Sequence, residues 1–563
     1  MLIHELLNKA AELHADRTAF WLRSSDGFKP LTYAAMWRRV SAIAAGLPRL
    51  GHQPGGRIGI YAANSPEWCM IYLAILAAGG VAVPLDPQLK YLEIRTIIAR
   101  ADMRHIFCAH SSYADLVELS SMSMPHPDVI SIDPPPQSNA ALTLSQLEGL
   151  GFGKNPPPSP AKPNDLAILI FTSGTSGDSK GVMLSHENIT SDLEAIKPRL
   201  IITHDDRFLS VLPLHHTFES TCGFIFPLSI GASIGYVQSL KSADLLADVK
   251  ALRATVMCGV PLLYEKIHWG ILRALQKKSP IARLYVNLGR KLSDFSKSVL
   301  NIAAGKLIFK SLRAKAGLSS IRMFISGGAA LDPEVSRFFN NLGIVLLQGY
   351  GLTETSPVLS VNREIDNDYN SVGKPLDGVD IKILDINEQG IGEIAARGKM
   401  IMLGYYQNPE ATQAVMHDGY FATGDLGYVD AKGHIHITGR KKNVIITPAG
   451  KNIYPEEIEA VIDASPYIIE SAVLPRPKGT GQEPIAVVVP DFEYIASLNA
   501  NHVPTDEEIR RILKSEVLRL CEQLAEYKRV KDVLVMTEEL PKTSTRKVKR
   551  YVLVDTLQKL GEL

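Results

Sequence analysis

Short apolar runs bounded by turn residues alternate, along most of the chain, with longer stretches in which apolar residues return every three or four positions. The short runs predict β-strands, and the longer stretches predict helices with one buried face. Alternating strands and helices are typical of parallel sheets flanked by helices, so we predict an α/β fold. The clearest strands are predicted at residues 57–61, 167–171, 233–237, 255–259, 322–326 and 345–348, and the clearest helices at 33–50 and 333–341.

The pattern changes near Val379, where short alternating strands are separated by glycine turns, as in residues 380–385 and 433–438. This pattern of short strands and glycine turns indicates a small β subdomain. Beyond Arg440 the chain has the pattern and the size of a separate α+β domain. Its predicted elements are a helix from Pro455, a strand at 485–489 and a helix at 506–524. The expected organisation is a large N-terminal domain over residues 1–439, made of parallel-sheet subdomains and the β subdomain, and a C-terminal domain over 440–563.

One apolar stretch, residues 68–85, carries no charge and reaches the length at which a membrane helix must be considered. Gly79, Gly80 and Pro84 divide it, so we interpret it as a buried helix followed by a short strand. The first twenty residues contain several charges, which does not fit a secretory signal.

Charge and cysteine content exclude several classes of protein. The 563 residues include 60 basic and 59 acidic side chains, so the formal charge of +1 does not favour a nucleic-acid partner. The five cysteines are scattered and form no CxxC pair, which predicts neither a disulfide framework nor a zinc site. A reducing cytoplasm is the expected setting.

The strongest local motif is the strand at 167–171 followed by a loop of hydroxyl residues and glycines that ends at Lys180. Backbone N–H groups, hydroxyls and one ammonium group in such a loop can hold phosphates. The loop is not a Walker motif, because Gly181 follows the lysine where Ser or Thr is required. Taken alone, the alternative is an ordinary glycine- and serine-rich turn.

Together with later motifs, this loop resembles the adenylate-forming superfamily, and most closely the long-chain fatty acyl-CoA synthetases. The resemblance covers nearly the whole chain and rests on five motifs in the family's order, at residues 171–181, 348–355, 420–425, 439–443 and 541–547. It implies activation of a carboxylic acid by ATP and Mg²⁺ as acyl-AMP, with release of pyrophosphate, followed by thioester formation with coenzyme A. It also implies that residues 440–563 form a mobile lid.

The resemblance assigns roles residue by residue. Lys547, His216, Thr353 and Lys180 are the expected catalytic residues, and Glu354 is the expected magnesium ligand with Thr175 assisting, since Mg²⁺ prefers oxygen donors. Tyr350 would stack on adenine, with Gly328 and Ala329 close to its other side, and Asp425 and Arg440 would hold the ribose. The remaining residues expected to bind ATP or coenzyme A are Thr172, Ser173, Gly174, Ser176, Gly177, Gln348, Gly349, Gly351, Lys442, Gly450 and Lys451.

Three positions carry particular expectations. In the segment that meets the carboxylate, His216 is the expected functional histidine and His215 the packed one, while Glu219 keeps an amino-acid substrate open as an alternative. Lys442 is the expected hinge of the lid. Lys547 is expected to act in the first half-reaction only, although Arg546 stands where the family usually has glycine.

Residues 273–315 hold eleven basic residues and one acid, Asp294, a local charge of +10 among interleaved apolar residues. An amphipathic helical segment of this kind can lie on an anionic membrane, and the alternative is a solvated helical face. An insertion here resembles the long-chain enzymes, which is the main ground for a fatty acid substrate.

The sequence thus predicts an AMP-forming acid–CoA ligase in the cytoplasm, with peripheral contact on the inner face of a membrane as one interpretation. An acyl-carrier-protein ligase or an aryl-CoA ligase is the alternative function. The chain length of the acid and the oligomeric state stay open.

Overall fold

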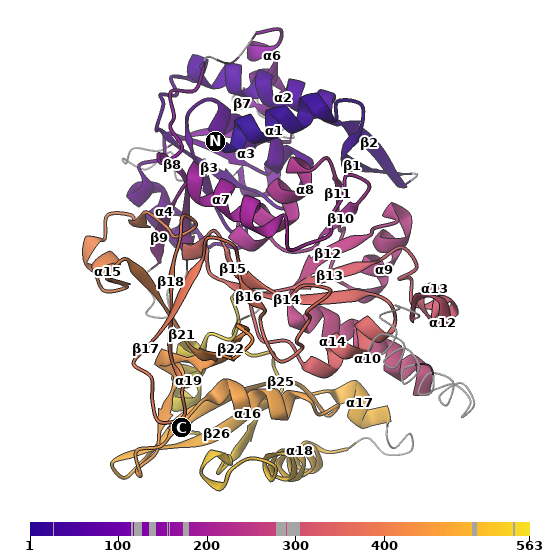
Figure 1. Cartoon of the computed structure of the whole chain (residues 1–563), viewed down its shortest axis with the longest axis vertical. Helices are drawn as coiled ribbons and strands as arrows, with labels where there is room; N and C mark the ends of the chain where they lie inside the picture. The colour runs from indigo at the N-terminus through magenta and orange to yellow at the C-terminus, as the bar shows by residue number, and fades with distance from the viewer. Residues whose placement is uncertain are drawn as a thin grey trace. The chain divides into compact units, whose positions relative to one another are not determined.

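The computed structural model describes residues 1–25, 27–113, 116, 127–133, 142–154, 156, 158–172, 179–276, 289, 305–497, 504–543 and 547–562. The chain folds into two compact units. The larger unit comprises residues 1–172, 179–380 and 397–414, and the smaller unit comprises 173–178, 381–396 and 415–563. Figure 1 labels most of the helices and strands of both units, coloured by residue number.

The larger unit contains a nine-stranded sheet whose centre is parallel and whose edges are antiparallel. The sequence predicted its strands at 233–237, 255–259, 322–326 and 345–348, but neither the central strand at 207–210 nor the mixed character of the sheet. The antiparallel strands are added by hairpins, which short connections allow and parallel pairing does not. In sheet order the strands are β16 (Lys374–Pro375), β15 (Val358–Val361), β14 (Val345–Gly351), β13 (Met323–Ser326), β12 (Val256–Gly259), β10 (Arg207–Ser210), β11 (Ser233–Tyr236), β1 (Thr18–Ser24) and β2 (Gly27–Thr32).

A second, eight-stranded sheet of the larger unit is parallel except at the edge that carries the glycine-rich loop. At that edge β8, β9 and β19 pair in antiparallel fashion. The strand order is β19 (Gly404–Tyr405), β9 (Lys180–Ser185), β8 (Leu166–Thr172), β4 (Val81–Pro84), β3 (Arg57–Tyr61), β5 (His105–Cys108), β6 (Asp128–Ser131) and β7 (Leu142–Thr143).

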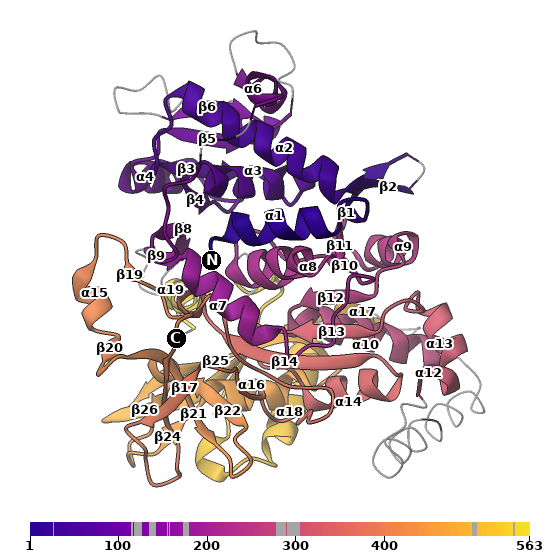
Figure 2. The ribbon, with the colours of Figure 1, turned by 45° about the horizontal axis from the view of Figure 1, so that its top comes forward.

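Helices α1, α2, α3 and α8 pack on one another and lie between the two sheets in both ribbon views (Figures 1 and 2). The helices of this unit are α1 (Ile3–Leu13), α2 (Tyr33–Gly46), α3 (Pro66–Ala77), α4 (Tyr91–Ala101), α6 (Leu144–Gly151), α7 (His186–Ile196), α8 (Phe226–Ser229), α9 (Ser242–Leu252), α10 (Pro261–Gln276), α12 (Gly305–Ile308), α13 (Lys310–Lys315), α14 (Pro333–Asn341) and α15 (Pro409–Gln413).

The uncharged stretch at residues 68–85 forms α3, a glycine turn and β4, as the sequence predicted. Ser65 caps α3 by accepting a hydrogen bond from the Trp68 N–H, and every residue from Trp68 to Ala77 is buried. The chain leaves the helix through Gly79, whose φ of +74° lies in the left-handed region that glycine adopts readily. Among the described residues, no helix combines the length and the apolarity that crossing a membrane requires.

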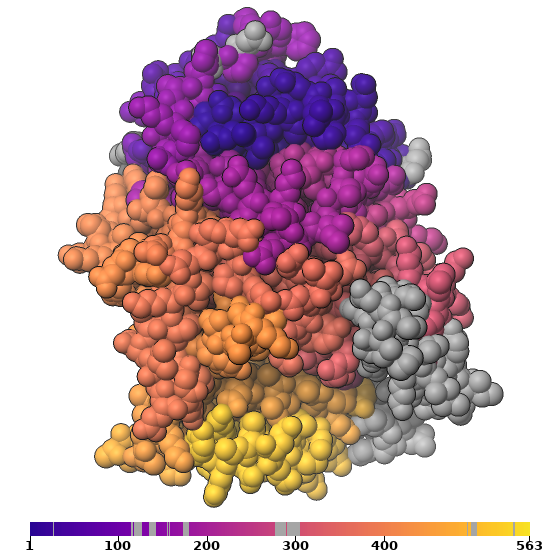
Figure 3. Space-filling model, in the orientation of Figure 1, coloured from indigo at the N-terminus to yellow at the C-terminus, as the bar shows by residue number. Residues whose placement is uncertain are grey.

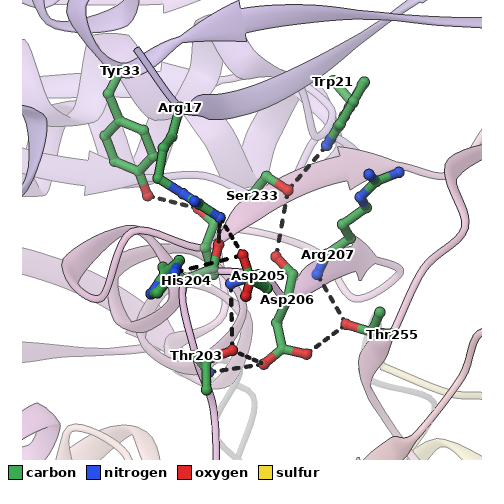
Figure 4. Close-up of polar contacts among 11 residues, drawn as sticks. Arg17, Trp21, Tyr33, Thr203, His204, Asp205, Asp206, Arg207, Ser233 and Thr255 are labelled. Carbon is green, nitrogen blue, oxygen red and sulfur yellow. Dashed lines mark hydrogen bonds and ion pairs between the residues drawn. The ribbon is translucent and has the colours of Figure 1, made fainter. Parts of the chain in front are cut away.

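Asp206 joins three neighbouring strands at the amino end of the nine-stranded sheet, as Figure 4 shows in part. Its carboxylate accepts hydrogen bonds from Thr203 before β10, from the Thr255 hydroxyl at 2.7 Å before β12, and from the Arg322 guanidinium at 2.7 Å before β13. Burial opposes ionisation of this carboxyl, but these hydrogen bonds prevail and lower its pKa. One ionised side chain thus fixes the amino ends of the strands whose other ends carry the site.

The smaller unit contains an antiparallel sheet built from β17 (Asp380–Leu384), β18 (Gly392–Arg397), β20 (Met416–His417), β21 (Tyr420–Val429) and β22 (Ile435–Arg440). This is the β subdomain that the glycine turns predicted. It also contains the hairpin of β23 (Ile445–Ile446) and β24 (Asn452–Ile453), and a three-stranded sheet of β25 (Ile468–Lys478), β26 (Gly481–Pro490) and β27 (Val533–Val535).

Both faces of the three-stranded sheet are covered, because alternate residues of a strand point to opposite sides. Val473, Ala486 and Val488 face a core with α16 (Pro455–Asp463) and α18 (Asp506–Cys521). Leu474 and Val487 face a core with α19 (Arg550–Leu560), and α17 (Phe492–Ser497) follows β26. The β subdomain belongs to the same compact unit as this domain. The predicted domain boundary at residue 440 describes which part of the chain moves as a lid, and this boundary stays a prediction.

Candidate active site

The strands that precede and follow the glycine-rich loop in the sequence, β8 and β9, are antiparallel neighbours. Thr172 at the end of β8 lies opposite Lys180 at the start of β9, and the Thr172 hydroxyl donates to the Lys180 carbonyl at 3.4 Å. The loop residues predicted to bind phosphate, Ser173, Gly174, Thr175, Ser176 and Gly177, lie outside the described residues.

Thr353 and Glu354 follow β14 in a single turn of 3-10 helix at residues 353–355. The sharp turn requires Gly351, where a Cβ atom would lie 1.7 Å from the Pro357 carbonyl oxygen. Thr355 is buried and holds the turn, because its hydroxyl accepts from the Leu352 N–H at 2.9 Å and donates to the Pro357 carbonyl. Thr353 and Glu354 are left half-buried at the carboxyl end of a strand, where α/β proteins commonly bind ligands.

The predicted adenine site is assembled from two neighbouring parallel strands. Ser326 of β13 lies opposite Gln348 of β14, so Gly328 and Ala329 leave the sheet at the same edge as Tyr350. Tyr350 is 9% exposed, whereas Gly328 and Ala329 are exposed. Gly328 has a φ of +85°, a conformation that disfavours any other residue.

Tyr405 of β19 joins two predicted residues, although no sequence motif singled it out. Its hydroxyl donates to Glu354 Oε1 at 2.9 Å, and the Lys180 ammonium lies 4.8 Å from the centre of its ring. Burial, and next the adjacent Glu354 carboxylate, raises the pKa of Tyr405 well above its usual value, so the phenol keeps its proton. A two-residue strand has too little periodicity for sequence analysis to detect.

The two histidines of the predicted carboxylate segment differ as expected. His215 is buried, its Nε2 lies 3.6 Å from Asp86 Oδ2, and burial lowers its pKa to about 4. His216 is half-buried, with its ring centre 4.2 Å from that of His215.

Glu219 is 1% exposed, and burial raises its pKa to about 8, so its carboxyl is neutral at pH 7. A neutral carboxyl is a poor partner for a substrate ammonium group.

In the smaller unit, Asp425 and Arg440 form an ion pair. They lie opposite each other in the pairing of β21 with β22, and Arg440 Nε is 2.6 Å from Asp425 Oδ1. Asp425 is buried and Arg440 half-buried, so the pair sits at the edge of solvent.

Lys442 lies in the 3-10 turn at residues 441–443 that follows β22. Lys442 is exposed, and partial desolvation, then the charges of Arg440 and Lys547, lowers its pKa to about 8. Lys547 is exposed, and its carbonyl accepts from the Thr543 N–H at 2.8 Å. Arg546, beside it, lies outside the described residues. The predicted hinge and the predicted catalytic lysine therefore belong to one cationic neighbourhood.

Gly450 and Lys451, predicted to meet the pantetheine arm, lie in the turn between β23 and β24. Gly450 has a φ of +73° and no atom within 4 Å of the position of a Cβ. The Lys451 ammonium lies 4.7 Å from the centre of the Tyr527 ring.

Comparison with known proteins identifies the class. The AMP-binding enzyme family matches residues 7–406, and the AMP-binding enzyme C-terminal domain matches residues 457–547. The chain is 32% identical to long chain acyl-CoA synthetase 1 of Arabidopsis thaliana over 76% of its own length and 69% of the relative's. It is 32% identical to long-chain-fatty-acid–CoA ligase 5 of Rattus norvegicus over 84% and 73% of the two lengths.

Among solved structures, ATP-bound MatB from Rhodopseudomonas palustris superposes with a TM-score of 0.77 at 28% identity, covering 100% of both chains. The anthranilate CoA ligase AuaEII shares the fold with a TM-score of 0.79 at 23% identity, covering 100% of this chain and 98% of that one.

The chain belongs to the AMP-binding enzyme family, whose members form adenylates. Within it, the protein is an AMP-forming acid–CoA ligase, which uses ATP to activate a carboxylic acid and then forms a thioester with coenzyme A. The motifs quoted from the sequence identified this family correctly.

Proposed function

We propose that the acid is a fatty acid of medium or long chain. Relatives that align with more than three quarters of this chain are named as long-chain acyl-CoA synthetases. This similarity is the observation that carries the proposal, and Glu219, a buried carboxyl that is neutral at pH 7 in the segment predicted to meet the substrate, argues against the alternative of an amino acid. A site for an amino acid would need an ionised carboxylate there to hold the substrate ammonium.

Adenylation requires a carboxylate to attack the α-phosphorus of a polyanion, so cationic groups and hydrogen-bond donors must be in place before the reaction. In this proposal Lys547 bridges the carboxylate and the α-phosphate, the Thr353 hydroxyl donates to that phosphate, and His216 orients the carboxylate. Lys180 neutralises the outer phosphates. None of these groups needs to act as a strong base, because carboxylic acids are already ionised at neutral pH.

Glu354 would hold Mg²⁺, with Thr175 assisting. The donor set fits the ion, because Glu354 is half-buried and only its Oε1 is engaged by Tyr405, which leaves Oε2 as an oxygen donor. The ion would neutralise phosphate charge. Tyr350, Gly328 and Ala329 would hold adenine.

Asp425 and Arg440 would hold the ribose hydroxyls as acceptor and donor. Lys442 would be the hinge about which a lid of residues 440–563 reorients between the half-reactions, and Gly450 with Lys451 would then line the path of pantetheine. Conformational steps of this kind place a different set of residues at one site for each reaction.

The experiment that tests the substrate class offers fatty, aryl and amino acids in turn and measures acid-dependent pyrophosphate release and thioester formation. Coenzyme A, an acyl carrier protein and hydroxylamine serve as separate acceptors. We expect the highest kcat/KM with fatty acids and coenzyme A. Preference for an aryl acid or for the carrier protein would support the two alternative functions, and preference for an amino acid would overturn the interpretation of Glu219.

We also propose that the larger unit docks on anionic membrane through a basic patch formed by Lys250, Arg253, Lys306, Lys310 and Lys315, with Leu307 among them. Helix α9 leads into β12 and α13 leads into β13, and these strands are parallel neighbours, so the carboxyl ends of both helices lie at one edge of the sheet. A Cβ on Gly317 would lie 3.5 Å from the Leu246 Cβ, which supports this proximity.

All five cations of the basic patch are exposed, and none forms an ion pair with another described residue. Leu307 is 81% exposed between Lys306 and Lys310, and in Figure 3 the rose-coloured surface at the right edge belongs to α12 and α13. Exposed cations around an apolar side chain match the chemistry of an anionic lipid surface.

Arg313 does not belong to this surface, which corrects the sequence-based count. It is 3% exposed and donates to the carbonyls of Leu342, Gly343, Leu318, Ser319 and Ile321. Its role is to satisfy loop carbonyls beneath α13. Six of the other cations in the counted stretch, Lys277, Lys278, Arg283, Arg290, Lys291 and Lys297, lie outside the described residues.

A further inference from the structure

The short strand β19 lies between two of the motifs that the proposed function uses. It pairs with β9, which begins at Lys180, and the Tyr406 N–H donates to the Gly181 carbonyl at 2.7 Å. On the side of β14, the Met402 N–H donates to the Glu354 carbonyl at 2.8 Å. Backbone hydrogen bonds therefore tie residues 402–406 to Gly181, the neighbour of the lysine in one motif, and to the glutamate of the other.

The side chain of Tyr405 makes a second connection between the same two residues. Its ring lies under the Lys180 ammonium at 4.8 Å, within the range of a cation–π interaction, and its hydroxyl donates to Glu354 Oε1 at 2.9 Å. Tyr405 is 6% exposed, and its own N–H donates to the Thr412 hydroxyl at 2.9 Å, so it has little freedom to turn away. No ion pair joins Lys180 to Glu354, both of which the structure describes.

We propose that Tyr405 is a positioning residue that holds Lys180 and Glu354 apart and aims the Glu354 carboxylate at the metal of the Mg²⁺–ATP complex. The proposal rests on the proposed roles of Lys180 and Glu354. An ammonium and a carboxylate that contact the same side chain could otherwise pair with each other before ATP binds and would have to separate when it does. By engaging Oε1, the phenol leaves Oε2 for the cation and lowers the reorganisation that binding requires.

The test compares Tyr405→Phe, Tyr405→Leu and Tyr406→Phe in the full-length enzyme. Tyr405→Phe keeps the ring under Lys180 and removes only the hydroxyl. The matched control is Tyr406→Phe, because Tyr406 is the next residue, is itself a tyrosine, and its hydroxyl accepts from the Gln407 amide at 3.4 Å. The readout is acid-dependent pyrophosphate exchange measured as a function of free Mg²⁺.

For Tyr405→Phe we expect about a 10-fold loss of exchange at low Mg²⁺, the size of one hydrogen bond to a charged group. Saturating Mg²⁺ should restore part of the loss, so the Mg²⁺ concentration at half-maximal rate should rise several-fold. A merely structural role would lower the rate equally at every Mg²⁺ concentration. Tyr405→Leu should lose more, because Lys180 also loses its ring, and Tyr406→Phe should match the wild type.

A double variant shows whether the hydroxyl acts through Glu354. In the Glu354→Gln background, adding Tyr405→Phe should change the rate by less than about 2-fold, since coupled residues are not additive. If Glu354→Gln impairs exchange while Tyr405→Phe keeps the wild-type Mg²⁺ dependence, the positioning role is wrong and the proposed function stands. If Glu354→Gln itself leaves exchange unchanged, it is the proposed role of Glu354 that fails. Equal melting temperatures of the variants and the wild type exclude a folding defect.

Discussion

The charged residues of the larger and the smaller unit are arranged in opposite ways. In the larger unit Lys180 and Glu354 are kept apart by Tyr405, so each can meet a ligand without first breaking a bond with the other. In the smaller unit Asp425 and Arg440 are bound to each other at 2.6 Å, and Lys442 shares its surroundings with two further cations, Arg440 and Lys547. In the proposed function, the larger unit receives Mg²⁺ and ATP, and the charged residues of the smaller unit exchange partners between the two half-reactions.

The largest expected effect comes from Glu354→Gln, which keeps the shape of the side chain and removes its charge. Adenylation should fall by at least ~100-fold, the scale of losing one preorganised electrostatic group. Pyrophosphate exchange with a fatty acid measures the effect. Near-normal exchange would show that adenylation does not need the Glu354 charge, contrary to the role given to the larger unit.

Lys547→Ala tests whether the smaller unit serves the two half-reactions differently. Acyl-AMP formation should fall by roughly 100-fold, because the ammonium no longer stabilises the transition state. Formation of acyl-CoA from supplied acyl-AMP should stay within several-fold of the wild-type rate. A parallel loss of both rates would argue against a role limited to the first step, and Lys549→Ala is the control for a neighbouring cation.

Buried histidines should make the folding stability of the larger unit sensitive to acid. Burial lowers the pKa values of His52, His186 and His215 to about 4, against 6.5 for a free side chain. At these three positions the unfolded chain binds more protons below pH 6.5, so each histidine removes up to about 3 kcal/mol of stability as pH falls from 6.5 towards 4. Glu219, whose pKa is raised to about 8, contributes in the opposite sense.

Calorimetric melting between pH 7.5 and 4.5 measures this loss. Replacing His52 with Gln should flatten the pH dependence of melting, whatever its effect at pH 7.5. An unchanged slope in this variant would mean that other groups govern the acid transition.

Lys442→Pro should separate the half-reactions in the opposite sense to Lys547→Ala. Proline fixes φ at the predicted hinge, so acyl-AMP formation should be spared while thioester formation slows by about 10-fold. Rapid-quench measurement of both steps decides this, with Lys442→Ala as the control that removes the charge but leaves φ free. Equal slowing by the two variants would assign the effect to the ammonium and not to the backbone.

The smallest effect concerns the basic patch. Lys306→Gln should weaken binding to vesicles containing phosphatidylserine about 5-fold, since one basic residue contributes about 1 kcal/mol near an anionic surface. The wild-type interaction should weaken as salt is raised. The control is Lys432→Gln, which makes the same change in charge elsewhere. Equally weak binding to neutral and anionic vesicles would show that these cations form only a solvated helical face.

The sequence predicted those features that repeat or that belong to motifs. Six strands and the helix at 333–341 were predicted closely because a buried strand or an amphipathic helix has a periodic pattern, whereas the central strand β10 was missed. Gln348–Glu354 and Gly328–Ala329 were predicted to share a site, and the parallel pairing of β13 with β14 brings them to one edge.

Other features could not be predicted, because they depend on contacts between distant segments. Tyr405 reaches Glu354 across 51 positions of sequence, and nothing local distinguishes it from Tyr406. Arg313 has the composition of a surface cation and becomes internal only because the loops at 318–321 and 342–343 fold over it. The antiparallel edges of the sheets likewise follow from hairpin pairing and not from the alternation of elements.

The proton on Glu219 makes that side chain an internal spectroscopic reporter. A buried protonated carboxyl has a C=O stretching band in the infrared that is separate from the bands of ionised carboxylates, and the difference spectrum between wild type and Glu219→Gln isolates it. The band shifts when the polarity or the hydrogen bonding around the carboxyl changes. Titrating the enzyme with acids of increasing chain length would therefore report, without any turnover, which of them change the surroundings of the Glu219 carboxyl.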